Sequence, residues 1–410
     1  MGRESKERER PLEMKVLFID WNSYCNEDMK SALLTRGYSV RSVCFPDGIR
    51  TCADDAEKLL GRELEKGSCD FVFSFNYFPI ISGICQKAGI KYLSWVYDSP
   101  HIQVYSYTVL NTCNHIFLFD YGVYEELRQA GITTVHYLPL AVNAKRLSKI
   151  DTGRNGTMAD ISFVGSLYTE QKHRIYDKFK DIKPYVRGYL DAIMQAQKNI
   201  YGQNFLKELL RSDIMDELER VYPTDPNAST VMSPEAVYAD YVFSRQVTAM
   251  ERWEILALLG ERHRICLYTN DGSVRIPGVQ NQGATDYYRG MPGVFANSRI
   301  NLNITLRSIR TGIPLRAWDI MGSGGFLLTN FQQEYLNYFE PGSDFIYYDN
   351  YEDLAEKADY YLTYEKERRE IALSGCEKVR SEHTYEKRVD EMIRAVWGKE
   401  ERHENNDCAD

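Results

Sequence analysis

A short segment in the C-terminal third of the chain carries the residue types best suited to chemistry. Arg316 and Asp319 are three positions apart, so in a helix they lie one turn apart on the same face. Free backbone N–H groups and a cation at a helix start attract phosphate, and a carboxylate one turn further on suits ribose hydroxyls. Arg307 and Arg310 crowd the same end of the segment. The spacing favours a nucleotide-diphosphate site; the alternative is a buried Arg–Asp pair in an ordinary helix.

The elements that must position these residues form one predicted βαβ unit. Residues 299–305 have strand character, and Pro314 suits the first position of the short helix that follows. Gly322 and Gly324 end that helix, and residues 326–329 predict a buried strand. In such a unit the helix start faces the carboxyl edge of the sheet, where ligands bind.

The chain before this unit alternates strand and helix patterns, which implies parallel strands in an open, doubly wound α/β sheet. We predict a first Rossmann-like domain over residues 14–150. The turn after its first strand, residues 20–25, contains no glycine, which argues against a dinucleotide-binding GxGxxG loop. Its predicted strands are Lys15–Asp20, Ser39–Cys44, Asp70–Phe75, Lys91–Tyr97, His115–Phe119 and Thr134–Leu138.

A second Rossmann-like domain is predicted over residues 157–375, after a polar linker at 149–159. Helical periodicity replaces the alternation from about residue 170 to residue 262, which predicts a mainly helical insertion. The strand after the insertion ends at Tyr268 and Asn270, which would border a nucleotide base.

Two polar residues follow the strand at 91–97 in the first domain. Asp98 and His101 stand where the carboxyl end of a strand faces the ligand side of the sheet. A carboxylate or an imidazole there could take the proton of an acceptor hydroxyl. The alternative is that Asp98 only caps a turn before Pro100.

The segment 316–330 resembles the donor site of GT-B glycosyltransferases, in particular the CgeB-like, spore-maturation-type members of group 1 with a DUF3880-like N-terminal domain. The motifs at 162–167, 351–355 and 383–388 support this resemblance, which covers roughly residues 15–396. It implies two Rossmann-like domains facing a cleft, with the acceptor on the first domain and the donor on the second. It also implies that a C-terminal helix over residues 376–398 packs back on the first domain.

The resemblance assigns roles to individual residues. Arg316 would neutralise the departing diphosphate, Asp319 would hold the ribose, and Gly165 and Ser166 would meet the donor phosphate. Many retaining relatives have two glutamates eight positions apart here, whereas this chain has Thr311 at the first place, so donor sugar and stereochemistry stay open. The predicted catalytic residues are Asp98, His101 and Arg316. The predicted donor-binding residues are Gly165, Ser166, Tyr268, Asn270, Arg307, Arg310, Pro314, Arg316, Asp319, Gly322 and Gly324.

Composition narrows the class of protein further. The 410 residues suffice for two domains, and a net charge of −9 argues against a nucleic-acid binder. We expect no transmembrane helix and no signal peptide, since the sequence has no apolar run of about 18 residues and a charged start. Nine scattered cysteines without a CxxC pair indicate a reduced cytoplasm. The seven histidines show no HExxH-like spacing, and no DxD stands on a strand-end loop, so we predict a metal-independent enzyme without a cofactor.

The sequence therefore predicts transfer of a sugar from a nucleotide-diphosphate donor to a polysaccharide, lipid-linked or protein acceptor. Peripheral membrane contact and the oligomeric state stay open. Two alternatives from other classes remain: a nucleotide-sugar 2-epimerase-like isomerase, which shares the GT-B architecture, and a non-catalytic nucleotide-sugar-binding protein of a spore-coat or envelope system.

Overall fold

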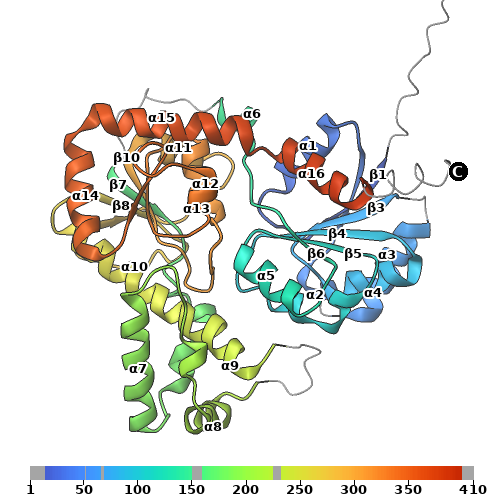
Figure 1. Cartoon of the computed structure of the whole chain (residues 1–410), viewed down its shortest axis with the longest axis horizontal. Helices are drawn as coiled ribbons and strands as arrows, with labels where there is room; N and C mark the ends of the chain where they lie inside the picture. Colours follow the sequence, from blue (N-terminus) through green and yellow to red (C-terminus); the bar gives the residue numbers. More distant parts are fainter. Residues whose placement is uncertain (1–13, 51, 66–68, 150–158, 225–231, 399–410) are drawn as a thin grey trace, which may run out of the picture. The chain divides into compact units, whose positions relative to one another are not determined.

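The computed structural model describes residues 14–50, 52–65, 69–149, 159–224 and 232–398 (Figure 1). Its strands form two six-stranded parallel sheets, in the orders β2-β1-β3-β4-β5-β6 and β12-β11-β10-β7-β8-β9. The predicted pair of Rossmann-like α/β sheets is therefore confirmed. The charged ends of the chain and most of the predicted linker lie outside the described residues.

The first sheet has the six strands expected from the sequence, each within one or two residues of the predicted bounds. The four inner strands bury large apolar side chains, as parallel strands covered on both faces must, whereas the edge strands at 39–44 and 135–137 each bury one valine. The strands are β1 (Lys15–Asp20), β2 (Ser39–Cys44), β3 (Phe71–Phe75), β4 (Lys91–Val96), β5 (Asn114–Leu118) and β6 (Val135–Tyr137). The helices between and after them are α1 (Asn26–Thr35), α2 (Asp47–Arg50), α3 (Ala53–Glu65), α4 (Pro79–Ala88), α5 (Tyr121–Gln129) and α6 (Ala144–Leu147).

The second sheet contains the predicted strands and one short edge strand, β9, that the sequence analysis missed. Its strands are β7 (Ala159–Val164), β8 (Ile265–Tyr268), β9 (Val279–Asn281), β10 (Ser298–Asn303), β11 (Leu327–Asn330) and β12 (Ile346–Tyr348). Helices α11 (Met291–Asn297), α12 (Leu315–Gly322) and α15 (Glu365–Glu382) pack together, as do α10 (Ser244–Gly260) and α14 (Tyr351–Thr363) (Figure 1). The remaining short helix of this region is α13 (Tyr335–Tyr338).

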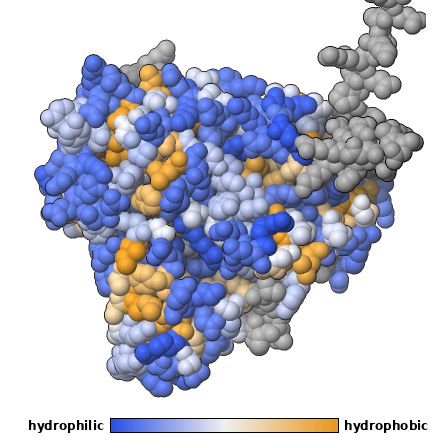
Figure 2. All heavy atoms as spheres, viewed as in Figure 1, coloured by the Kyte–Doolittle hydropathy of each residue, from blue (hydrophilic) through white to orange (hydrophobic). Residues whose placement is uncertain are grey.

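The predicted helical insertion lies between β7 and β8. It contains α7 (Pro184–Lys198), α8 (Ser212–Val221), α9 (Pro234–Ala236) and a π-helical turn at Val237–Phe243 that leads into α10. Phe179, Leu190, Leu218 and Phe243 belong to a buried apolar cluster of its own, so the insertion is a packed subdomain. Hydrophobic residues also gather on its surface, at the lower left of the face drawn in Figure 2.

The chain groups into two compact units. Met1–Trp95, Thr108–Phe117 and Tyr385–Asp410 form the first, and Val96–Tyr107 and Leu118–Thr384 form the second. The last helix, α16 (Tyr385–Trp397), therefore belongs to the first unit although it follows the second sheet in the sequence.

Specific contacts attach α16 within the first unit. Arg36, just after α1, forms an ion pair of 2.5 Å with Asp390. The ring of Trp397 lies 5.5 Å from that of Phe71 in β3. The last described helix thus packs beside α1 and against a strand of the first sheet.

Candidate active site at the carboxyl edge of the second sheet

The carboxyl ends of β7, β8, β10 and β11 meet at one edge of the second sheet because these strands are parallel. Arg252 of α10 links two of these ends: it donates to the carbonyl of Ser166 (2.5 Å) and to that of Ile304 (2.6 Å). Asn330 accepts a hydrogen bond from the backbone of Thr305 at 2.8 Å. The strand-end loops are therefore fixed by side chains that satisfy their backbone groups.

The start of α12 lies at this edge, and two of the predicted donor-site residues, Arg316 and Asp319, belong to this helix. Arg316 contacts the sulfur of Met291, and its guanidinium lies 5.7 Å from the ring centre of Phe295. Asp319 is buried, and one carboxylate oxygen accepts a hydrogen bond of 3.2 Å from the hydroxyl of Tyr287. Residues of the segment 287–297 thus contact both side chains.

Of the remaining predicted residues around α12, Pro314 lies one position before the helix, whereas Gly322 and Gly324 stand at its end, as predicted. Pro314 is the N-cap residue, with φ −67° and ψ 151°, and the helix begins at Leu315. Gly322 and Gly324 are at the other end, which in a βαβ unit lies at the amino edge of the sheet. A Cβ at Gly322 would come within 2.9 Å of Val142, so this glycine permits close packing. The structure does not bring Gly322 and Gly324 to the start of α12.

Arg307 follows β10 at the carboxyl edge but its guanidinium turns into the protein. It pairs with the buried carboxylate of Glu251 and donates to the carbonyls of Lys198 and Ile200, both at 2.8 Å. Its guanidinium also lies 4.1 Å from the ring centre of Tyr201. These contacts connect the loop after β10 to the insertion. The guanidinium of Arg307 therefore stabilises the fold, and none of these contacts places it in the predicted donor site.

Gly165, Ser166 and Tyr268 gather at the ends of β7 and β8. The backbone N–H of Gly165 donates to the carbonyl of Tyr268 at 2.9 Å. The hydroxyl of Ser166 lies 2.9 Å from Glu170, and Asn270 is exposed. None of these four residues is among those that line the cavities described below.

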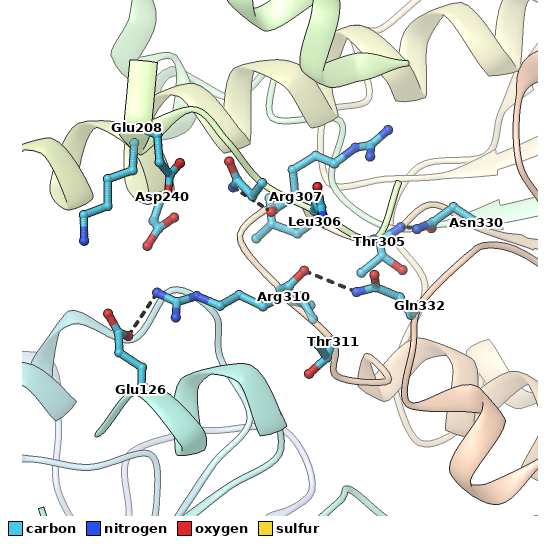
Figure 3. A pocket seen from close by; sticks show the side chains of 15 residues that line it. Glu126, Glu208, Asp240, Thr305, Leu306, Arg307, Arg310, Thr311, Asn330 and Gln332 are labelled. Atoms are coloured by element: carbon cyan, nitrogen blue, oxygen red, sulfur yellow. Dashed lines mark hydrogen bonds and ion pairs between the residues drawn. The ribbon is translucent and has the colours of Figure 1, made fainter. Parts of the chain in front are cut away.

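A polar cavity of about 300 Å³ opens at the ends of β10 and β11 (Figure 3). The loops after the two strands supply one wall, including Thr305, Arg310, Asn330 and Gln332, and the helical insertion supplies the opposite wall. Its volume falls at the lower end of the range for small-molecule sites. A polar lining of amides, hydroxyls and charges suits a sugar better than an apolar ligand.

Arg310 and Asp240 line both this cavity and a smaller one of about 30 Å³ beside it. Asp98 and His101, the predicted acceptor-side residues, line the smaller cavity. The fold therefore brings Asp98, His101 and Arg310, taken from positions about 200 residues apart, around two adjoining cavities. Asp98 is exposed and His101 is half-buried, so both side chains are open to solvent.

Arg310 sets the electrostatics of this region. Its guanidinium points towards Glu126 and pairs with it at 3.0 Å, while Asp240 approaches from the insertion side (Figure 3). Burial raises the pKa of Asp240 to about 6, with Arg310 acting in the opposite direction. Asp240 is thus a carboxyl group that can change its protonation state near neutral pH, which is a common property of functional sites.

Two carboxylates, those of Asp120 and Glu334, lie beside Thr311, the residue that departs from the two-glutamate pattern. Asp120 accepts from the backbone N–H groups of Arg310 (2.7 Å) and Thr311 (3.1 Å). Glu334 is buried and accepts from the hydroxyls of Thr311 (2.7 Å) and Tyr137 (2.6 Å). Burial raises the pKa of Glu334 to about 7.

Sequence reasoning missed Asp120, Asp240 and Glu334. Asp120 follows β5 by two residues and Glu334 follows β11 by four, so the rule that singled out Asp98 could have found both. Asp240 lies inside the insertion, where no local pattern distinguishes it from a solvent-exposed helical acid. Only the packing of the insertion places it opposite Arg310.

Within the part of the chain that the structure describes, no group of three or more His, Cys, Asp or Glu side chains could hold a metal ion. No helix among the described residues is long and apolar enough to cross a membrane. Independence from metal stays a prediction.

Part of the chain matches a known family of proteins. Residues 247–394 match the family described as glycosyl transferase-like, which covers somewhat more than a third of the chain. The matched range includes β8, β10, α12 and β11, and so contains the start of α12 with Arg316 and Asp319. No curated protein matches the sequence.

Solved structures resemble the fold at very low sequence identity. Sucrose-phosphate synthase from Thermosynechococcus elongatus has a TM-score of 0.57 at 8% identity, over 95% of this chain and all of that one. HepE from Anabaena, in complex with UDP-glucose, has a TM-score of 0.52 at 10% identity, over 94% and 100% of the two chains. A glycosyltransferase from Rickettsia africae has a TM-score of 0.50 at 10% identity, over 96% and 100%.

These structural matches establish the GT-B type of α/β fold. The sequence match over residues 247–394 adds the class of enzyme. The protein is a glycosyltransferase of the GT-B type.

Proposed function

We propose that this glycosyltransferase uses a nucleotide-diphosphate sugar as donor and that α12 forms the core of the donor site. One observation carries the proposal. Arg316 and Asp319 lie one turn apart at the start of a helix, at the carboxyl edge of a parallel sheet, inside the range that matches the glycosyl transferase-like family. That edge is where open α/β sheets bind nucleotides.

Each part of the donor would be bound by different residues. The backbone N–H groups at the start of α12, together with Arg316, would bind the diphosphate and stabilise the charge that develops as it leaves. Asp319, already accepting from Tyr287, would hold the ribose hydroxyls. The polar cavity beside Arg310 would take the sugar.

The acceptor is proposed to approach from the side of Asp98 and His101. These residues line the smaller cavity that shares Arg310 with the polar one. If the reaction inverts the anomeric centre, Asp98 or His101 would remove the proton from the acceptor hydroxyl. We also propose, from the motifs at 162–167, 316–330, 351–355 and 383–388, a CgeB-like enzyme with a glycan, lipid-linked or protein acceptor, acting in the cytoplasm without a metal.

Binding tests the proposal most directly. A ligand that binds only the folded state raises the melting temperature, so a screen of UDP-, GDP-, dTDP- and CDP-sugars should reveal the donor. UDP-glucose is the first candidate, because the similar HepE structure contains it. No stabilisation by any of these donors, with the protein folded, would contradict the proposal.

The products then separate transfer from the other activities. Incubation with the stabilising donor should release nucleoside diphosphate, slowly to water and faster with an acceptor. An epimerised donor sugar would instead identify an isomerase, and unchanged donor would identify a binding protein.

A further inference from the structure

A third cavity, of about 610 Å³, lies at the amino edge of the second sheet. The ends of α11 and α12, the start of β10 and one side of α15 line it. The proposed donor site is at the start of α12, whereas this cavity contacts Ser323 and Gly324 after its end. A helix of eight residues is about 12 Å long, so the cavity is a separate site.

Four arginines and one glutamate line this cavity, which gives it a positive charge in a protein whose net charge is −9. The arginines are Arg299, Arg368, Arg369 and Arg380, and the acid is Glu365. Such a surplus on one small surface is unusual for an acidic chain, and it attracts anions.

Two of these arginines have a carboxylate partner and two do not. Arg299 pairs with Asp160 at 3.3 Å and Arg369 with Glu365 at 2.5 Å, but Arg368 and Arg380 have no carboxylate within ion-pair distance among the described residues. Arg368 is buried and donates to the carbonyl of Tyr361; Arg380 donates to the carbonyl of Gly322. Carbonyl oxygens accept hydrogen bonds without neutralising a full charge. Burial and the neighbouring Arg299 lower the pKa of Arg368, as expected for cations held close together.

A second observation, which does not depend on the charge of the cavity, also points to a ligand. Ser323 is almost fully buried, with 1% of its surface exposed, and lines the same cavity. Its hydroxyl has no hydrogen-bond partner among the described residues. A buried hydroxyl without a partner costs free energy, and a bound oxygen would remove that cost.

Part of the remaining wall is apolar, although Asn297 and Ser298 also line it. Phe326, Ala372 and Leu373 line the cavity beside the arginines, and Leu373 is 59% exposed. The volume is also far larger than one phosphate group needs. These features fit a ligand that joins a phosphate to a larger, partly apolar body.

We propose that the amino-edge cavity binds a phosphorylated organic molecule, with its phosphate held by Arg368, Arg369 and Arg380 and by the hydroxyl of Ser323. Arginine suits this role because its planar donors match phosphate oxygens in pairs. The same chemistry is presented by a free phosphorylated metabolite and by the headgroup of an anionic lipid.

Calorimetry with inorganic pyrophosphate tests the site, using the full chain with Arg316→Ala so that the proposed donor site is already weakened. Arg369→Glu should weaken the remaining binding about tenfold or more, because it reverses a charge at the cavity. Lys366→Glu makes the same change on the same helix outside the cavity, where the side chain is 90% exposed, and should change the affinity less than about twofold. Ser323→Ala should weaken binding without altering the charge.

Two arms distinguish the sources of the phosphate. Cosedimentation with phosphatidylcholine vesicles, with and without phosphatidic acid, should show binding that Arg369→Glu abolishes if the ligand is a lipid headgroup. Binding of pyrophosphate without vesicle binding supports a free metabolite. Equal pyrophosphate affinity in folded Arg369→Glu, Ser323→Ala and Lys366→Glu proteins, together with unchanged vesicle binding, would overturn the inference.

Discussion

Arg307 and Glu251 form a two-point ion pair in the interior of the second unit. Nε of Arg307 lies 2.9 Å from Oε2 of Glu251, and Nη2 lies 3.0 Å from Oε1. Both side chains are buried, with 7% and 0% of their surface exposed. The pair therefore anchors the loop after β10 to α10, and this loop continues to Arg310 and Thr311.

The first prediction concerns this anchor. Glu251→Gln should destabilise the protein by about 3–5 kcal/mol, because it leaves a buried guanidinium without its counter-charge. Denaturant unfolding measures the change. Glu370→Gln, at an exposed pair with Lys366, is the matched control and should change stability by less than about 0.5 kcal/mol. A small effect of Glu251→Gln, equal to the control, would show that the pair is not an anchor.

The second prediction concerns the donor site. Arg316→Ala should weaken nucleotide-diphosphate binding by about 1.5–3 kcal/mol, the usual contribution of a charge-assisted hydrogen bond, and the fold should survive. Calorimetry with the donor found in the screen measures it. Arg262→Ala removes an exposed cation just before β8 and should leave the affinity unchanged. Unaltered binding in folded Arg316→Ala protein would remove Arg316 from the site.

A third prediction addresses the acceptor side. Asp98→Asn or His101→Ala should slow turnover by about 10²–10⁴-fold if one of them is the general base of an inverting reaction. Donor affinity should stay nearly unchanged, because the proposed donor contacts are at α12. Rate and donor affinity must therefore be measured on the same preparations. Near-normal turnover in both variants would eliminate the base assignment and favour a retaining mechanism.

The fourth prediction is a pH dependence of stability from Glu334, whose pKa is raised by burial from 4.5 to about 7. Below both values the carboxyl is protonated in the folded and the unfolded chain. Between them the unfolded chain loses this proton while the folded protein keeps it, so the unfolding free energy falls as pH rises, by up to about 1.4 kcal/mol per pH unit.

Glu334→Gln isolates this contribution. The variant cannot ionise at this position, so its stability should fall less steeply than that of the wild type between pH 4.5 and about 7. Urea unfolding at a series of pH values measures the slopes. Glu370→Gln, at an exposed position, should keep the wild-type slope. Parallel curves for Glu334→Gln and the wild type would show that Glu334 ionises normally in the folded state.

The fifth prediction concerns metal. Transfer should persist in EDTA, because Arg316 and the start of α12 are proposed to supply the positive charge for the leaving diphosphate. The test is to measure the rate of sugar transfer with and without EDTA, and again after magnesium or manganese is added. Complete loss in EDTA with recovery on addition of either ion would contradict the prediction.

The sequence by itself determined the architecture, because strand and helix patterns are local. The largely apolar run at 71–75 specifies a buried strand within five positions, and the segment 39–44 forms an edge strand in which Val43 is the buried residue. The spacing of Arg316 and Asp319 is local in the same sense, and one helical turn places both at the start of α12.

Only the tertiary structure decided which distant groups meet. Arg307 looked like a donor-site cation, but the insertion supplies Glu251 and turns its guanidinium inward. Asp240 acquires its raised pKa from the surroundings that packing creates. Periodicity records which face of an element is buried, whereas partners separated by tens or hundreds of residues depend on how those faces pack. Which charged groups face a site, and which are paired elsewhere, can therefore be determined only from the folded structure.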